Sequence, residues 1–130
     1  MSVDFIRQSI ETRLNGNWTD TPIAYENTPF TPEKGEPFIA PYILTGEGEQ
    51  ASLGSVAVNR WYGLLDIALF VPLDSGTKRA MELVDQLIKL FYHYEVGGLT
   101  FLTGSWERLG QDDNWYRYSV SIPFQYDEIM

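Results

Sequence analysis

The stretch that decides the fold spans residues 60–91 and reads RWYGLLDIALFVPLDSGTKRAMELVDQLIKLF. Leu64 to Val71 is apolar on both alternating faces except at Asp66, which predicts a central β-strand covered on both faces. Residues 72–76 carry proline, aspartate, serine and glycine and predict a turn. Over residues 80–91, apolar side chains recur with the i, i+3, i+4, i+7 spacing of a helix. This stretch therefore predicts a buried strand followed by the main core helix.

A shorter amphipathic helix is predicted at the start of the chain. Its apolar stripe consists of Val3, Ile6, Ile10 and Leu14. The sequence Asn-Gly-Asn at residues 15–17 is expected to end the helix, because glycine and asparagine tolerate the left-handed conformation of a C-cap. Phe5 lies off the stripe and so predicts a second contact for this helix. Prolines and glycine over residues 18–37 leave room only for one short strand, at residues 23–26.

The next predicted strand covers residues 38–44 and carries Pro41. Proline cannot donate a ladder hydrogen bond, so this strand is expected at an edge of the sheet or with a bulge. Residues 46–55, GEGEQASLGS, are rich in glycine and acid and predict a flexible loop. That loop contains Glu47, Glu49 and Leu53.

The end of the chain predicts a hairpin. Residues 99–109 form its first strand, with a bulge expected at Gly104, and residues 111–114 form its turn. The last strand has apolar residues at six alternate positions from residue 116 to residue 126. The predicted fold class is therefore α+β, with an antiparallel or mixed β-sheet and two main helices on one face, in a single domain over residues 1–130.

Composition restricts the function classes. Nine Lys and Arg stand against 18 Asp and Glu, a net charge of −9 spread along the chain, and no basic run is present to neutralise DNA phosphates. There is no cysteine, which excludes disulfides and thiolate chemistry. The start of the chain lacks the pattern of a signal peptide, and no apolar run is long enough to span a bilayer. A soluble protein made in a cytoplasm is expected.

The residues give no positive sign of catalysis, a metal or a cofactor. His93 is the only histidine and is expected to be a packed or capping residue. Nucleophile elbows, phosphate-binding loops and dinucleotide fingerprints are missing. The acidic pairs fall in predicted turns, a loop and the C-terminus, where solvation explains them; these pairs are Glu47/Glu49, Asp112/Asp113 and Asp127/Glu128. An enzyme is therefore not expected.

The order of features over residues 3–95 resembles the tail terminator family of long-tailed bacteriophages, of the siphophage type. The resemblance rests on serial order and spacing rather than on one motif. It uses the opening helix, Ile23 to Asn27, Phe30-Thr31-Pro32, the strand at 38–44, Leu53-Gly54, Arg60-Trp61-Tyr62-Gly63-Leu64, Pro72, Gly76 and the helix that ends at Phe91.

The resemblance implies a structural virion protein without catalytic residues. Such a protein forms a homo-oligomer, typically a hexameric ring, on the tail tube protein and ends tube polymerisation at its final length. It then offers a surface to a head-completion or connector protein, and DNA passes through its bore without specific binding. The implied location is the head-proximal end of the virion tail, reached from the host cytoplasm during assembly, with no membrane involved.

Two sets of residues are candidate contacts under this reading. Glu47, Glu49 and Leu53 are predicted to face the bore or a neighbouring subunit, because their segment is long, glycine-rich and acidic. Phe5 and Trp61 are predicted to contact the tube or a subunit through apolar groups. The alternatives are a phage neck or tail-completion protein, an acidic inhibitor that mimics DNA, and a small-ligand binding protein. The interspersed positive charges argue against the DNA mimic.

Overall fold

The computed structural model describes residues 3–50 and 58–129, and the side chains of 3–46 and 59–128. The described part contains two helices and one six-stranded sheet. In chain order the elements are α1 (Val3–Asn17), β1 (Phe38–Gln50), β2 (Val58–Pro72), α2 (Lys78–Phe91), β3 (Glu95–Val96), β4 (Leu99–Phe101), β5 (Ser105–Asp112) and β6 (Trp115–Ile129). The α+β class is confirmed, and every pairing between named strands is antiparallel.

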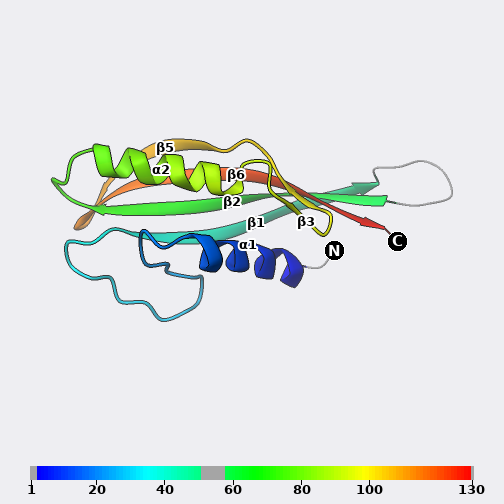
Figure 1. Ribbon diagram of the computed structural model, residues 1–130, viewed down its shortest axis with the longest axis horizontal. Helices are drawn as coiled ribbons and strands as arrows, with labels where there is room; N and C mark the ends of the chain where they lie inside the picture. The colour runs from blue at the N-terminus through cyan, green and yellow to red at the C-terminus, as the bar shows by residue number, and fades with distance from the viewer. Residues whose placement is uncertain (1–2, 51–57, 130) are drawn as a thin grey trace.

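Three long strands form the backbone of the sheet. The order β1-β2-β6 continues through β4 to β3, and β5 also pairs with β6. Because β2 pairs with β6 along its whole length, β4 and β5 share the other side of β6, opposite its two ends. Figure 1 shows β1, β2 and β6 continuing past both helices at the side where the C-terminus lies. The molecule is therefore elongated along these strands.

Both helices cover the same face of the sheet, as the sequence predicts. Ile6, Ile10 and Leu14 of α1 and the apolar stripe of α2 lie in one cluster with the odd-numbered positions of β2 and the even-numbered positions of β6. Val3, the first residue of the predicted α1 stripe, is exposed instead. Arg13 of α1 ties the helices together, because its Nε donates to the carbonyl oxygen of Leu90 at 3.0 Å. Its guanidinium also lies 4.2 Å from the ring centre of Tyr94.

The opposite face of the sheet departs from the prediction. Asp66 and its apolar neighbours on that side of β2 are half-buried, and neither helix covers them. Only one end is closed, by an aromatic cluster in which Phe38 stacks on Phe70 at 4.5 Å while Phe30 and Trp115 pack beside it. The expectation that β2 is covered on both faces is therefore wrong for most of its length.

Two corrections concern β1 and the segment before it. Residues 46–50 continue β1 as a strand, with a register shift between Thr45 and Gly48, so the predicted loop does not begin at residue 46. The prediction of an edge strand is confirmed, whereas the irregularity of β1 lies between Thr45 and Gly48 and not at Pro41. The expected strand at 23–26 is reduced to one parallel bridge between Ile23 and Ile39.

Further corrections concern the ends of elements. Helix α1 continues through Asn17 rather than stopping at residue 15. The first strand of the terminal hairpin is two strands, β4 and β5, and its bulge lies between Arg108 and Gly110 instead of at Gly104. Gly110 has a φ of +89°, the left-handed conformation that favours glycine, which explains why the bulge forms there.

Candidate assembly surfaces

Phe5 and Trp61, predicted as contact residues, lie on the same face and at the same end of the molecule. Trp61 is the cross-strand partner of Tyr126, and the ring of Phe5 lies 5.8 Å from the ring of Tyr126. Both predicted residues are half-buried rather than fully exposed. Phe5 also faces Gly97, where an added Cβ would lie 2.6 Å from the Phe5 ring. The structure therefore joins these side chains into one aromatic surface, here called the Tyr126 surface (Phe5, Trp61 and Tyr126).

The predicted acidic segment is described only in part. Glu47 and Glu49 belong to β1, where Glu49 is the register partner of Arg60 and Glu47 falls within the register shift. Their side chains lie outside the described ones, and Leu53 lies outside the described residues altogether. Their predicted role at a bore or subunit contact stays a prediction.

Next to this segment, an ion pair joins β2 to β6. Arg60 donates through its Nε to one Asp127 oxygen at 2.7 Å and through a terminal nitrogen to the other at 3.1 Å. The pKa of Arg60 is raised mainly by this hydrogen bonding to Asp127 and further by a bond to Tyr62. Two parallel bonds fix the guanidinium plane, so the pair holds the projecting end of the sheet in register. Sequence reasoning missed it because residues 67 positions apart meet only through strand pairing.

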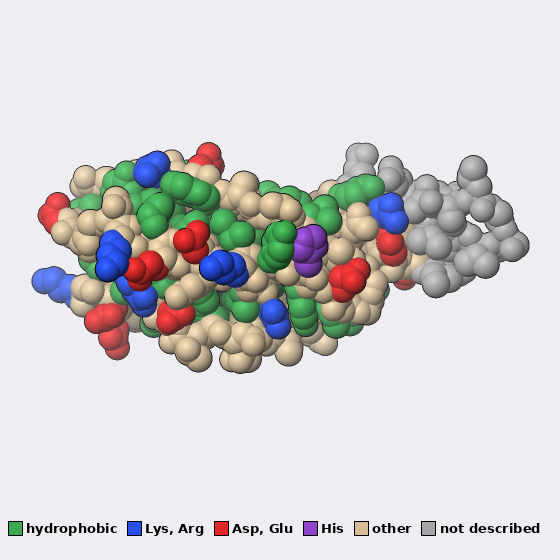
Figure 2. Space-filling view, turned by 45° about the horizontal axis from the view of Figure 1, so that its top comes forward, with side chains coloured by type: hydrophobic (Ala, Val, Ile, Leu, Met, Phe, Trp, Pro, Cys, Tyr) green, Lys and Arg blue, Asp and Glu red, His purple; other side chains and the backbone are tan. Residues whose placement is uncertain are grey.

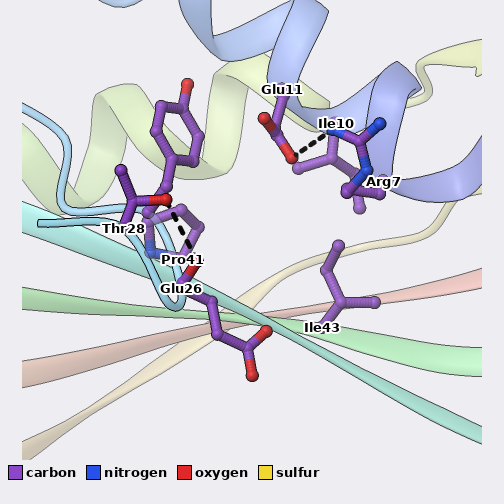
Figure 3. Close-up of a pocket in the computed structure, with 8 residues that line it drawn as sticks. Arg7, Ile10, Glu11, Glu26, Thr28, Pro41 and Ile43 are labelled. Atoms are coloured by element: carbon purple, nitrogen blue, oxygen red, sulfur yellow. Dashed lines mark hydrogen bonds and ion pairs between the residues drawn. The ribbon is translucent and has the colours of Figure 1, made fainter. Parts of the chain in front are cut away.

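A groove of about 240 Å³ lies beside the outer edge of β1. Figure 3 shows Ile10 and Glu11 of α1 on one side of the groove and Thr28, Glu26 and Pro41 on the other, with Ile43 of β1 below α1. Arg7 is held at the rim by ion pairs with Asp4 at 2.7 Å and Glu11 at 2.9 Å. The hydrogen bond from Arg7 holds the pKa of Asp4 below its ordinary value. The rim carries more acidic than basic side chains.

The opposite edge of the sheet is β5, and seven of its eight residues are exposed. Trp106 keeps 40% of its surface exposed, and the guanidinium of Arg108 lies 5.0 Å from its ring centre. Leu109 adjoins them and is also exposed. Trp106 also lies 6.4 Å from the ring of Tyr118, so its exposed ring is held on the edge by neighbours from β5 and β6.

The face of the sheet that neither helix covers also carries exposed apolar side chains, toward the end of the sheet that extends past the helices. Tyr42, Leu44 and Tyr62 are 47%, 44% and 42% exposed. They lie on neighbouring strands, since Leu44 pairs with Leu64 and Tyr42 pairs with Asp66. Asp66 supplies the carboxylate that β2 places on this face. One of its oxygens accepts a hydrogen bond from the Ser119 hydroxyl at 2.7 Å.

Among the described residues, no group of three or more His, Asp or Glu is arranged to hold a metal ion. His93 is exposed rather than buried, and its ring lies 4.1 Å from the ring of Tyr92. Its φ of +53° just after α2 is the left-handed conformation common at helix C-termini, so of the two expected roles its position fits capping rather than burial in the core. Figure 2 shows this histidine at the surface, with acidic and basic side chains interspersed around it. No helix in the described part of the chain is long and apolar enough to cross a membrane.

Comparison with known proteins first defines the fold class. One solved structure matches 97% of this chain and 96% of its own chain with a TM-score of 0.70, at 22% sequence identity. At that identity the likeness shows the fold alone. The two chains share this small α+β fold over nearly their full lengths. A search of curated proteins finds no match.

The particular family follows from the sequence. A family model described as phage tail terminator protein matches residues 5–124. The chain belongs to this family, as its resemblance predicted. The family is one of structural phage tail proteins rather than enzymes, so the chain is a component of the tail that interacts with other phage structural proteins.

Proposed function

We propose that this chain terminates the growth of a phage tail tube. Copies of the chain form a hexameric ring on the last ring of tube protein, stop further addition, and offer the surface that a head-completion or connector protein joins. The observation that supports the proposal is the family match over residues 5–124. Assembly takes place in the host cytoplasm, and the finished ring lies at the head-proximal end of the tail.

The charge of the chain suits a ring through which DNA passes. Its net charge is −9, and the acidic residues are distributed along the sequence. Neutralising phosphates with Lys and Arg is what makes a protein hold DNA, so an acidic bore repels the duplex instead of trapping it. DNA is thus proposed to pass without specific binding.

The growth of tail tubes in the presence of this protein tests the proposal. Purified tube protein from the same phage is polymerised with and without the chain, and tube lengths are measured by electron microscopy. Substoichiometric protein is expected to shorten the tubes and to prevent their extension when fresh tube protein is added. Unchanged lengths would contradict termination. Binding to the connector but not to tubes would instead support the neck or tail-completion alternative.

The Tyr126 surface is the proposed contact with the tube or a neighbouring subunit. Phe5→Ala and Trp61→Ala each remove an aromatic side chain next to Tyr126, and each is expected to weaken tube binding at least tenfold, as loss of an interface hot spot does. Tyr92→Ala is the matched control, because Tyr92 is an exposed aromatic residue of a different segment. Thermal unfolding checks that both variants remain folded. Unaltered tube binding in both folded variants would remove this surface from the proposal.

Glu47, Glu49 and Leu53 are proposed to line the bore or a subunit boundary. Replacing Glu47 and Glu49 by lysine changes the charge by about four units per subunit at the tip of β1, where phosphates would then be attracted. We expect slower DNA ejection or a disturbed ring, measured by ejection kinetics and native mass. Glu33→Lys with Glu36→Lys gives an equal charge change outside the sheet and serves as the control. Normal assembly and ejection in the Glu47/Glu49 variant would refute the assignment.

A further inference from the structure

The outer side of β1 is an edge of the sheet. The segment at residues 22–24 pairs with its first residues. Ile39 donates its N–H to the Pro22 carbonyl at 3.2 Å and accepts from the Ala24 N–H at 2.7 Å. In an antiparallel strand both backbone groups of a residue point the same way and alternate along the chain, so Pro41 and Ile43 also point outward. Proline at an outward position leaves the β1–β2 ladder intact. The outward groups that another strand can use are thus the Pro41 carbonyl and both backbone groups of Ile43, since Pro41 has no N–H.

Side chains beside this edge form a receptor for an apolar group with a positive charge nearby. The groove described above is lined by Ile10, Tyr25, Pro41 and Ile43, and its rim carries Glu11 and Glu26. Glu26 makes no ion pair among the described residues, whereas Glu11 is already paired with Arg7. A basic partner would therefore meet an uncompensated carboxylate.

The β5 edge carries the complementary groups. Trp106 is exposed, and Arg108 has no ion pair among the described residues. Trp106 is the partner of Val120 and Arg108 is the partner of Tyr118, so both point to the helix-covered face. Pro41 pairs with Ile67 and so faces the same way. The groove beside β1 and the two β5 side chains therefore lie on the same face of the sheet, at opposite edges.

The directions of β1 and β5, and their positions along the sheet, also suit pairing between two copies. Each step from β1 to β2, from β2 to β6 and from β6 to β5 reverses direction, so β5 runs opposite to β1. A second copy turned about an axis along the strands would place its β5 antiparallel to β1. The register sets Trp106 level with Pro41, through Val120 and Ile67. A stagger of about two residues, of the kind that closed sheets require, brings Trp106 opposite Ile43.

We propose that the β5 edge of one copy adds to the β1 edge of the next, with Trp106 in the groove and Arg108 beside Glu26. This inference rests on the ring proposed above and names its subunit contact. Main-chain bonds would supply affinity and the groove would supply register, as in other strand additions. Since the two edges differ, the contact is heterologous, and such contacts generate rings when the rotation closes.

Cysteine cross-linking tests the contact directly, because the chain has no native cysteine. Leu44→Cys and Ser105→Cys, placed together in one chain, put thiols on exposed neighbouring positions of the two edges while Trp106 and Arg108 remain. A short bis-maleimide is expected to give a ladder of cross-linked species that ends at the closed ring. Leu44→Cys with Tyr92→Cys is the control and should give no ladder. The reaction is run on free protein and on tubes that the protein has capped.

Charge exchange provides an independent test. Arg108→Glu is expected to raise the concentration needed for assembly at least tenfold, and adding Glu26→Arg to the same chain should restore part of the loss. A missing ladder on capped tubes, or assembly unaffected by Arg108→Glu, would overturn the contact. Tube capping by variants without the ladder would leave the proposed function standing, whereas a ladder without any effect on tube length would refute the function and keep the contact.

Discussion

Replacing Gly63 by alanine is expected to destabilise the protein, because the middle of β2 has no room for a side chain. A Cβ at this position would lie 2.3 Å from Cζ and 2.6 Å from Cε1 of Phe124, the cross-strand partner. It would also lie 2.7 Å from the Leu44 carbonyl oxygen. Carbon atoms in favourable contact are about 3.5–4.0 Å apart, so more than an ångström must be gained.

The size of the effect follows from what has to move. Phe124 is 1% exposed and packs against Phe101 at 5.9 Å, so its ring has no free space to enter, and the Leu44 oxygen belongs to the neighbouring backbone. Overpacking of this kind costs about 1–3 kcal/mol. Alanine recovers about 0.4–1 kcal/mol by restricting the unfolded chain. A net loss of about 1–2 kcal/mol is expected, or a Tm lower by roughly 3–10 °C for a chain of this size.

Chemical and thermal unfolding monitored by circular dichroism measure this loss. Gly16→Ala is the matched control, because Gly16 lies in α1 with no neighbouring atom within 4 Å of a built Cβ. That variant should be unchanged or stabilised by up to about 1 kcal/mol. Phe124→Leu combined with Gly63→Ala should lose less than the sum of the two single losses, because the smaller side chain makes room. A Gly63→Ala variant as stable as the original chain would refute the reasoning.

Two further predictions concern the ion pair and a buried tyrosine. Because the Arg60–Asp127 pair is bidentate but about one-third exposed, a double-mutant cycle with Arg60→Met and Asp127→Asn should give a favourable coupling that shrinks at high salt. A coupling of zero at low salt would contradict this expectation. Burial, with a smaller contribution from Tyr116, raises the pKa of Tyr118, so the folded state holds this proton more tightly than the unfolded state. Stability should therefore fall as the pH rises through and above the ordinary tyrosine pKa of about 10, and Tyr118→Phe should reduce that fall; equal alkaline losses in both proteins would refute the assignment.

The sequence predicts the elements whose periodicity is carried by many residues. Helix α2 and strand β6 have apolar side chains in one phase over most of their length, and the core buries these side chains or packs against them. Pro41 predicts an edge strand because a missing N–H has a direct structural consequence. The family resemblance likewise rests on order and spacing, which single residues do not disturb, and the family match confirms it.

Features that depend on pairing could not be predicted in the same way. Residues 46–50 have the composition of a loop, yet β2 provides a partner strand that keeps them extended. The break between β4 and β5 arises because they pair with different parts of β6, which no local pattern contains. The helix-free face was expected to be covered because β2 is apolar on both sides, and the tertiary structure leaves most of that face open.

The candidate contact residues could be predicted individually from the sequence, but their arrangement in space could not. Phe5 and Trp61 were predicted as contacts because they are apolar groups that a binding face could use, and Phe5 also lies off the stripe of its helix. Their meeting at Tyr126 needs the register of β2 with β6 and the position of α1, which the sequence does not contain. The groove beside β1 was missed for the same reason, since its walls come from three separate segments.

The position and number of copies on finished tubes test the central claim most directly. Tubes grown with tube protein and then capped by a labelled form of the chain can be imaged by cryo-electron microscopy. A single ring of six copies at one end of each tube, with no copies along its length, is the expected result. Labelled chain along the tube wall, or tubes whose ends stay bare and continue to grow, would contradict the proposal that this protein terminates the tail.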